Sequence, residues 1–441
     1  MTERDFDVVL FGATGFTGQL VAERLVERAP EGTRIALAGR SLAKLGAVRD
    51  GLGPRAAEWP LLLADSGNES TLTKLARSTV AIASTVGPYA KYGLPLVEAC
   101  ARAGTHYVDL TGEVLFMRAS ADAYDEMAKE SGARIVHSCG YDSIPSDLGV
   151  LLLHEAAGPL GQTMLLVKDT RGGFSGGTLA SGRVQAAAMA SDPEARAIAA
   201  DPYSLSPDRD AEPDLDSQGE LAGERDLSGA VHHPDLGWLA SFVMGPTNSR
   251  VVRRSNALAG YPYSREFTYQ EAMSFGEGLA ARAKATGMSA GMGALGAAFN
   301  FGPTRSGMGK VLPKPGEGPS AEERAAGHFR MEIHGYGLDG KHYVATVAAQ
   351  GDPGYAATSL MLAESVLLAA SGDPDLPDVA GVLTPATGFG MALVERLRAA
   401  GMTFEVGLAP TPEASADEAE PDVGGEDPAT DEVGEQAADS D

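Results

Sequence analysis

The chain has 441 residues, of which 44% are hydrophobic, and its formal net charge is −25 at pH 7. This length and apolar content can fill two packed cores, and no part of the chain is basic enough to follow a nucleic-acid backbone. Its two cysteines, Cys100 and Cys139, lack the spacing of a disulfide framework or a zinc site, so we predict no metal centre.

An apolar strand pattern at Phe6–Phe11 opens the chain and runs into the sequence Gly-Ala-Thr-Gly-Phe-Thr-Gly, after which a helical pattern begins. Glycines at this place let the backbone turn sharply off the strand and approach a pyrophosphate, which the positive end of the following helix then faces. A tight turn without a ligand is the alternative. The predicted pyrophosphate-binding residues of the loop are Gly12, Thr14, Gly15, Phe16, Thr17 and Gly18.

The second predicted strand, 34–40, ends at Arg40, where a domain that prefers NAD would usually carry an acidic residue. A guanidinium is always charged and matches a phosphate bidentately, so Arg40 and the neighbouring Ser41 hydroxyl fit the 2′-phosphate of NADP. An ordinary exposed arginine at a helix start is the alternative. The sequence therefore favours NADP(H) over NAD.

Strand and helix patterns alternate through the first third of the chain, which predicts a Rossmann-type, doubly wound parallel sheet. Ligands bind such sheets at the carboxyl ends of the strands. We therefore expect Asp65 on the adenine side and Gly87, Pro88 and Tyr89 on the nicotinamide side, although Asp65 could equally be a helix cap. The four further strands predicted in this sheet are 60–64, 81–86, 106–110 and 134–138.

Beyond about residue 148 strand patterns follow one another directly, which predicts a second α+β domain with a mostly antiparallel sheet. Gly337–Lys341 is expected to join the last two strands as a hairpin, and helical patterns return after Tyr355. The predicted strands are Met164–Lys168, Phe242–Met244, Val251–Ser255, Glu266–Glu271, His328–Tyr336 and His342–Gln350.

The end of the chain is strongly acidic. Residues 413–441 contain twelve Asp and Glu and no Lys or Arg, so the rest of the chain carries −13. This composition predicts a disordered tail. The predicted parts are an NADP-binding Rossmann domain (1–145), a second α+β domain for substrate binding or dimerisation (146–352), C-terminal helices and a strand that pack back on the Rossmann domain (353–408), and the disordered acidic tail (409–441).

Hydride transfer from a nicotinamide needs a group that polarises or protonates the substrate. The candidates are Tyr89, which follows the Gly-Pro turn, and Tyr141 and Asp142, which follow the sixth strand. The alternatives are that the tyrosines are walls of the cofactor pocket and that Asp142 caps a helix. His137 and Cys139 fit a core histidine and a packed thiol better than catalytic groups.

Several motifs together resemble the saccharopine dehydrogenase-like oxidoreductases, and most of all the branch of trans-acting enoyl reductases. The resemblance spans the chain to about residue 405. It implies an NADP-type Rossmann domain, a second domain with a mixed or antiparallel sheet, and reduction of a carbon–carbon double bond in a carrier-bound polyketide or lipid chain. The motifs are GATGFTG (12–18), AGRS (38–41), VGPYAKYG (86–93), PLVEACARAGTHYVDLTGE (95–113), CGYDSIPSDLG (139–149), GGFSGGTLAS (172–181), VVRRSNAL (251–258) and LPKPGEGPS (312–320).

Three functions remain open at this point. The first is an NADPH-dependent enoyl reductase that acts on a small-molecule or carrier-bound acyl substrate. The second is an imine reductase or amino-acid dehydrogenase, which would need cationic groups for substrate carboxylates; the candidates are Arg171, Arg183, Arg253 and Arg254. The third is an NADP(H)-binding protein without turnover that is associated with lipid.

Location and partners are expected from the same patterns. No uninterrupted apolar run reaches the roughly 18–20 residues of a spanning helix, and the two cysteines fit a reduced setting, so we expect a cytoplasmic protein. Because neither half of the chain is basic enough to follow a nucleic-acid backbone, we expect no nucleic-acid partner. The uncharged segment 288–301, MSAGMGALGAAFNF, fits a peripheral lipid or membrane contact, or alternatively a packed internal helix. A homodimer is compatible with the sequence.

Overall fold

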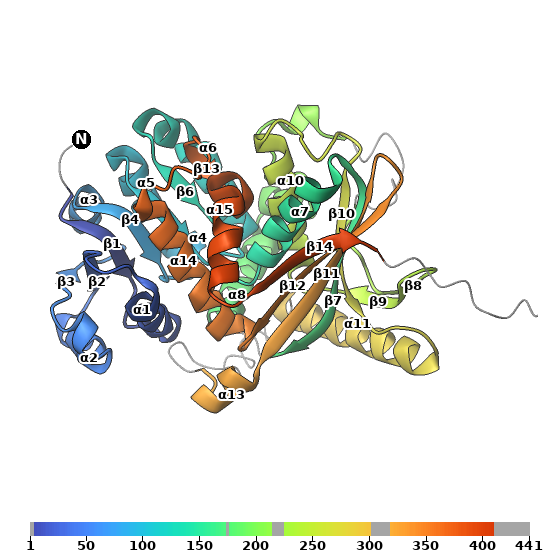
Figure 1. The fold of residues 1–441 in the computed structure, drawn as a ribbon, viewed down its shortest axis with the longest axis horizontal. Coiled ribbons are helices and arrows are strands. Elements are labelled where there is room, and N and C mark those ends of the chain that lie inside the picture. Colours follow the sequence, from blue (N-terminus) through green and yellow to red (C-terminus); the bar gives the residue numbers. More distant parts are fainter. Residues whose placement is uncertain (1–3, 173–175, 214–224, 301–317, 410–441) are drawn as a thin grey trace, which may run out of the picture. The chain divides into compact units, whose positions relative to one another are not determined.

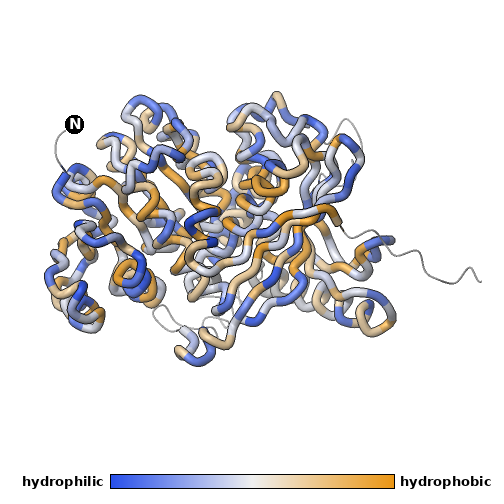
Figure 2. The backbone as a smooth tube through the Cα atoms, viewed as in Figure 1, coloured by the Kyte–Doolittle hydropathy of each residue, from blue (hydrophilic) through white to orange (hydrophobic). Residues whose placement is uncertain are grey.

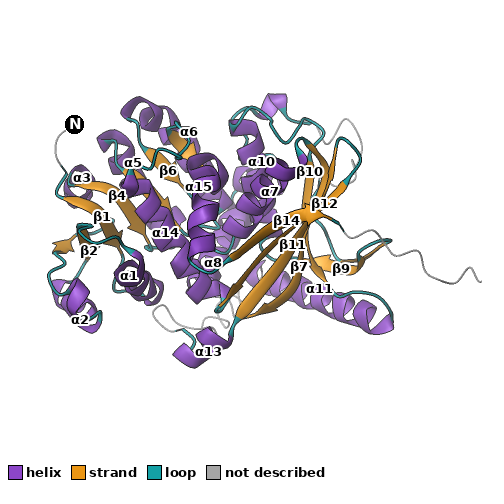
Figure 3. Ribbon diagram, in the orientation of Figure 1, coloured by secondary structure: helices purple, strands orange, loops and turns teal. Residues whose placement is uncertain are grey.

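Two seven-stranded sheets organise the chain up to Leu408 (Figures 1 and 3). The computed structural model describes residues 4–172, 176–213, 225–300 and 318–409. The predicted disordered tail therefore lies outside the described residues, apart from Ala409.

The first sheet is parallel throughout, with the strand order β13-β6-β5-β4-β1-β2-β3. Its central strands are continuous apolar runs, as in β1, because helices cover both faces. One face packs on α1 and α14, and the other on α3, α5 and α6. The predicted doubly wound sheet is confirmed. Its elements are β1 (Phe6–Phe11), α1 (Phe16–Arg28), β2 (Ile35–Gly39), α2 (Leu42–Gly51), β3 (Leu61–Leu63), α3 (Glu69–Arg77), β4 (Thr79–Ser84), α4 (Tyr89–Tyr92), α5 (Leu94–Ala103), β5 (His106–Asp109), α6 (Val114–Ser131), β6 (Arg134–Val136) and β13 (Gly381–Leu383).

The second sheet is mixed, with the order β14-β12-β11-β7-β10-β9-β8. Every neighbouring pair is antiparallel except β7 and β10, so the expected mostly antiparallel sheet is confirmed. The elements of this part are α7 (Ile144–Ala157), β7 (Leu160–Arg171), α8 (Gly176–Ser191), α9 (Pro193–Ala200), β8 (Ala230–His233), β9 (Gly237–Ser241), α10 (Gly245–Leu258), β10 (Thr268–Ser274), α11 (Leu279–Asn300), α13 (Ala321–Ala326), β11 (His328–Gly337), β12 (His342–Gln350), α14 (Thr358–Ser371), α15 (Pro385–Ala399) and β14 (Thr403–Leu408).

One large apolar core joins the two sheets. Alternate residues of β11, among them Phe329, Met331 and Ile333, are buried against α7, and the same cluster continues through α14 to the first sheet. Figure 2 shows the hydrophobic strands at the centre of both sheets. Because contacts up to Leu408 form one unit, the predicted borders at 145 and 352 stay predictions.

Two strand predictions were wrong. Val251–Ser255 lies in the middle of helix α10, and Phe242–Met244 follows the end of β9. The apolar pair at the start of the first segment resembles a strand, but the next residues are arginines whose side chains are buried in the packed helix. Arg254, for example, donates hydrogen bonds to the carbonyls of Leu205 and Val382. Contacts with residues distant in the sequence stabilise the helix, and a local sequence pattern does not reveal such contacts.

The C-terminal segment is shared between the sheets. β13 pairs with β6 of the first sheet, whereas β14 pairs with β12 of the second. Helix α14, which precedes both strands, packs on α1. Its buried Glu364 forms ion pairs with Arg28 of α1 and Arg396 of α15. Among the described residues, Pro353–Ser371 alone is long and apolar enough to cross a membrane, and it is mostly buried within this core.

Candidate dinucleotide and substrate cleft

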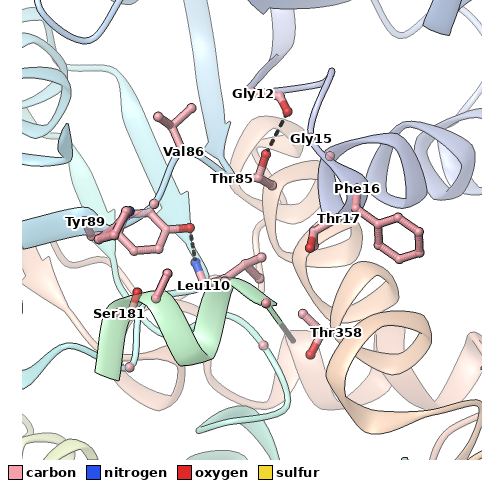
Figure 4. A pocket seen from close by; sticks show the side chains of 18 of the residues that line it. Gly12, Gly15, Phe16, Thr17, Thr85, Val86, Tyr89, Leu110, Ser181 and Thr358 are labelled. Atoms are coloured by element: carbon pink, nitrogen blue, oxygen red, sulfur yellow. Dashed lines mark hydrogen bonds between the residues drawn. The ribbon is translucent and has the colours of Figure 1, made fainter. Parts of the chain in front are cut away.

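A cleft of about 720 Å³ lies at the carboxyl ends of the parallel strands (Figure 4). The glycine loop after β1, the turn after β4 and the segments after β5 and β6 line one side. The starts of α8 and α10 and the segment before α14 line the other. Parallel sheets bind ligands at this edge.

The glycine loop has the close packing that a pyrophosphate site requires. Gly12 has a φ of 97°, and a Cβ there would lie 2.7 Å from Oγ1 of Thr85. A Cβ at Gly18 would lie 2.2 Å from the carbonyl oxygen of Gly12. Gly15 is the N-cap residue of α1. Because it has no side chain, the first N–H groups of the helix receive no side-chain acceptor from the cap. Such a helix start binds an anion. Thr14, Phe16 and Thr17 also line the cleft, as expected.

Two cations line the cleft after β2, where the sequence predicts the adenine side. Arg40 lines the cleft as expected, and Lys44, in the first turn of α2, lines it as well. Together they fit the 2′-phosphate of NADP. The sequence analysis missed Lys44, although it follows Arg40 by only four residues. Whether its side chain reaches the cleft depends on the residue at which α2 begins.

Ser41 and Asp65 do not line the cleft. The Ser41 hydroxyl caps α2 by accepting the backbone N–H of Lys44, and the Asp65 carboxylate accepts the N–H of Gly67 at 2.8 Å. Both side chains are occupied in local turns, and Ser66 lines the cleft instead.

Gly87, Pro88 and Tyr89, which the sequence predicts on the nicotinamide side, line the cleft, and the Gly87-Pro88 bond is cis. The Tyr89 hydroxyl donates to the carbonyl of Ser84 at 2.9 Å. It also accepts the N–H of Leu110 at 3.3 Å, as Figure 4 shows. Burial raises the pKa of this hydroxyl well above its ordinary value. Because this hydroxyl keeps its proton and donates it to a backbone carbonyl, Tyr89 fits a residue of the cleft wall better than a proton donor to substrate.

Glu113 is a second carboxyl group of the cleft that sequence reasoning missed. Its carboxylate accepts the backbone N–H groups of Tyr89 and Ala90, both at 2.8 Å, and the hydroxyl of Ser181 on α8. It therefore holds the start of α4 and ties α8 to the first sheet. Its place at the end of the THYVDLTGE motif, just after β5, was a signal that it faces the strand ends.

The two candidates after β6 are separated by the fold. Asp142 lines the cleft, where burial raises the pKa of its carboxyl group to about 6. A Cβ at Gly112 would lie 3.6 Å from its Oδ2 and 3.0 Å from Cε of Met244, so the glycine leaves room between these two side chains. Tyr141 lies outside the lining and packs edge-on against Phe329, with ring centroids 4.9 Å apart.

Other polar groups near the strand ends are structural. His137 is buried between Asp109 and Ser120, at 2.8 Å from each, and burial raises the pKa of the Cys139 thiol well above its ordinary value. Neither residue lines the cleft. In the part of the chain that the structure describes, no three His, Cys, Asp or Glu side chains are grouped to hold a metal ion.

The glycine loop, the uncapped start of α1 and the cations beside β2 together define an NADP-dependent oxidoreductase with a Rossmann-type domain. Residues 8–136 match the family model of the saccharopine dehydrogenase NADP-binding domain.

Curated relatives extend the match to most of the chain. A trans-acting enoyl reductase homologue from Mycobacterium tuberculosis is 48% identical over 92% of this chain and 98% of its own length. The trans-acting enoyl reductase of Mycobacterium ulcerans is 45% identical over 91% of this chain and 97% of its own length. The chain belongs to the saccharopine dehydrogenase-like oxidoreductases, in the branch of trans-acting enoyl reductases. Among solved structures, saccharopine dehydrogenase from Saccharomyces cerevisiae aligns at 12% identity and a TM-score of 0.48, covering 91% of this chain and 99% of its own.

Proposed function

We propose that the protein is a trans-acting enoyl reductase that reduces a carbon–carbon double bond in a carrier-bound acyl, polyketide or lipid chain with NADPH. The observation that carries this proposal is the charge of the cleft. Among its described lining residues, Arg40 and Lys44 are the only cations, and both follow β2, where we expect the adenine half of the cofactor. The substrate half instead holds the carboxyl groups of Glu113 and Asp142.

An amino-acid substrate does not fit this half of the cleft, because its carboxylates would meet like charge without a partner. The arginines that an imine reductase would use are elsewhere. Arg253 donates to the carbonyl of Tyr269 at 2.9 Å within the packed α10, and neither Arg171 nor Arg183 lines the cleft. A neutral thioester needs no cation, and apolar walls for its chain are present at Leu110, Val243 and Met244.

Asp142 is the candidate proton donor of this reaction. NADPH, when bound, supplies the hydride that adds to the β-carbon of the unsaturated thioester. The charge left on the substrate is neutralised when the neutral Asp142 carboxyl group gives its proton to the α-carbon, and water then restores that proton. A pKa of about 6 leaves part of the population neutral near pH 7, as a general acid requires.

The test is NADPH consumption with a panel of enoyl thioesters, compared with 2-oxo acids mixed with amino acids. We expect turnover with the thioesters only, and a lower kcat in Asp142→Asn with an unchanged Kd for NADPH. Turnover with the oxo-acid mixtures alone would favour an imine reductase. NADPH binding without turnover on either panel would favour the non-catalytic alternative.

A further inference from the structure

Helix α11 is apolar and yet largely exposed. Its early residues Ala281 and Ala285 are buried, where the helix packs on β8 and β9. After Ala285 the described side chains have little cover, and Met288, on the same face as the two alanines, is 39% exposed. Beyond its first turns the helix carries no charged residue on any face, and an apolar helix of this kind is ordinarily buried in a core or in lipid.

The charge around α11 is opposite to that of the rest of the chain. The sequence from Gly278 to Gly316 contains no Asp or Glu and five Lys or Arg, so this stretch carries +5 and the remainder carries −30. Two of the five cations, Arg282 and Lys284, are exposed in the first turns of α11. From Ala285 to Asn300 the helix is uncharged, over a length of about 24 Å.

We propose that α11 (Leu279–Asn300) is an interfacial helix that binds an anionic lipid surface. Its uncharged length would enter the boundary between head groups and acyl chains, while Arg282 and Lys284 pair with anionic head groups. The helix would lie in the surface, because Pro353–Ser371 alone among the described helices is apolar enough to span a membrane.

Charge favours lipid over the other occupants of this face. A second copy of the chain on this face would bring Arg282 and Lys284 of both copies together, which costs binding energy. An acidic protein would find cations only at the first turns of the helix, and no charged group along the rest of α11. The helix also contacts α8, which lines the cleft through Ser181 and Gln185. A lipid surface bound there would lie one helix away from the substrate site.

Sedimentation of the full-length protein with vesicles tests this proposal. We expect binding to vesicles of phosphatidylcholine mixed with phosphatidylglycerol, weak binding to phosphatidylcholine alone, and loss of binding at high salt. Lys284→Glu should weaken binding at least about fivefold, since one charge near the surface contributes about 1 kcal/mol. The double variant Met288→Asp, Met292→Asp should not bind.

The control is Leu338→Asp, which places one acidic charge at an apolar side chain away from α11 that is 56% exposed in the turn after β11. It should bind vesicles as the parent does. All variants should keep thermal stabilisation by NADPH, which shows that they fold, because none of these residues lines the cleft. Failure of the parent to bind anionic vesicles, or equal binding by the double variant, would overturn the proposal. A dimer that the double variant lacks would assign the face to a second copy instead.

Discussion

Ser181, near the start of α8, donates a hydrogen bond to the buried carboxylate of Glu113 at the edge of the first sheet. The same carboxylate accepts two backbone N–H groups of α4, so one side chain joins the nicotinamide turn to the opposite wall of the cleft. Three donors on one buried anion make this contact sensitive to substitution.

Glu113→Gln tests this contact. An amide offers one acceptor oxygen in place of two, and its NH₂ group would face a donor. We expect the free energy of unfolding to fall by about 2 kcal/mol and the KM for NADPH to rise, measured by urea unfolding and initial rates. Ser181→Ala removes one donor only and should cost about 1 kcal/mol or less. A Gln variant with unchanged stability and KM would show that the carboxylate is not needed there.

Arg40→Ala and Lys44→Ala test the specificity for NADP. Each variant removes a cation from the adenine side, and a hydrogen bond to a charged group is worth about 1.5–3 kcal/mol. We expect the Kd for NADPH to rise by about tenfold or more in each, with the Kd for NADH little changed, measured by isothermal titration. Ser41→Ala is the control, because its hydroxyl caps α2 away from the cleft. Equal losses for both cofactors would contradict a 2′-phosphate site.

The rate should depend on the protonation of Asp142. Burial raises the pKa of this carboxyl group to about 6, and only its neutral form donates a proton. With a saturating enoyl thioester, kcat should therefore fall about tenfold per pH unit above that pKa. The kcat of Asp142→Asn should not show this decrease with pH. The same shift affects stability. A group with a raised folded-state pKa takes up protons on folding, so its contribution is lost as the pH rises from about 4 to about 6. A pH profile of Asp142→Asn identical to that of the parent would exclude Asp142 as the donor.

Glu364→Ala should strongly destabilise the fold. The buried carboxylate pairs with Arg28 at 2.6 Å and with Arg396 at 2.7 Å, so its removal leaves two guanidinium groups without their anion. Breaking a buried ion pair typically costs about 3–5 kcal/mol, and urea unfolding would measure it. Glu395→Ala is the control, since that residue forms an exposed pair with Arg398 and should cost under about 1 kcal/mol. Equal effects of the two variants would contradict the assigned role.

Local patterns were enough to predict the first sheet and the phosphate loop. A strand, three glycines and a helix lie within residues 6–28, so every interaction that shapes the loop is nearby in the sequence, apart from the contact with Thr85. The position of Arg40 at the cleft was predictable for the same reason, because it directly follows β2.

Side-chain direction after a strand end was not predictable. Asp142 and Tyr141 are adjacent, yet one lines the cleft and the other packs on β11, which is almost 200 residues further along the chain. Glu113 was missed because its partners are backbone N–H groups of a turn and a hydroxyl on α8. In both cases contacts distant in sequence decide the role of the residue.

The pairing of β13 with β6 has a consequence for biosynthesis. While the ribosome has completed only residues 1–145, the parallel sheet lacks its last strand and the cover of α14. An open strand edge and an apolar face are then exposed until more than 200 further residues have emerged, which is a risk for aggregation. The nascent nucleotide-binding part therefore depends on the last fifth of the chain, and we expect chaperones to occupy β6 and α1 during synthesis.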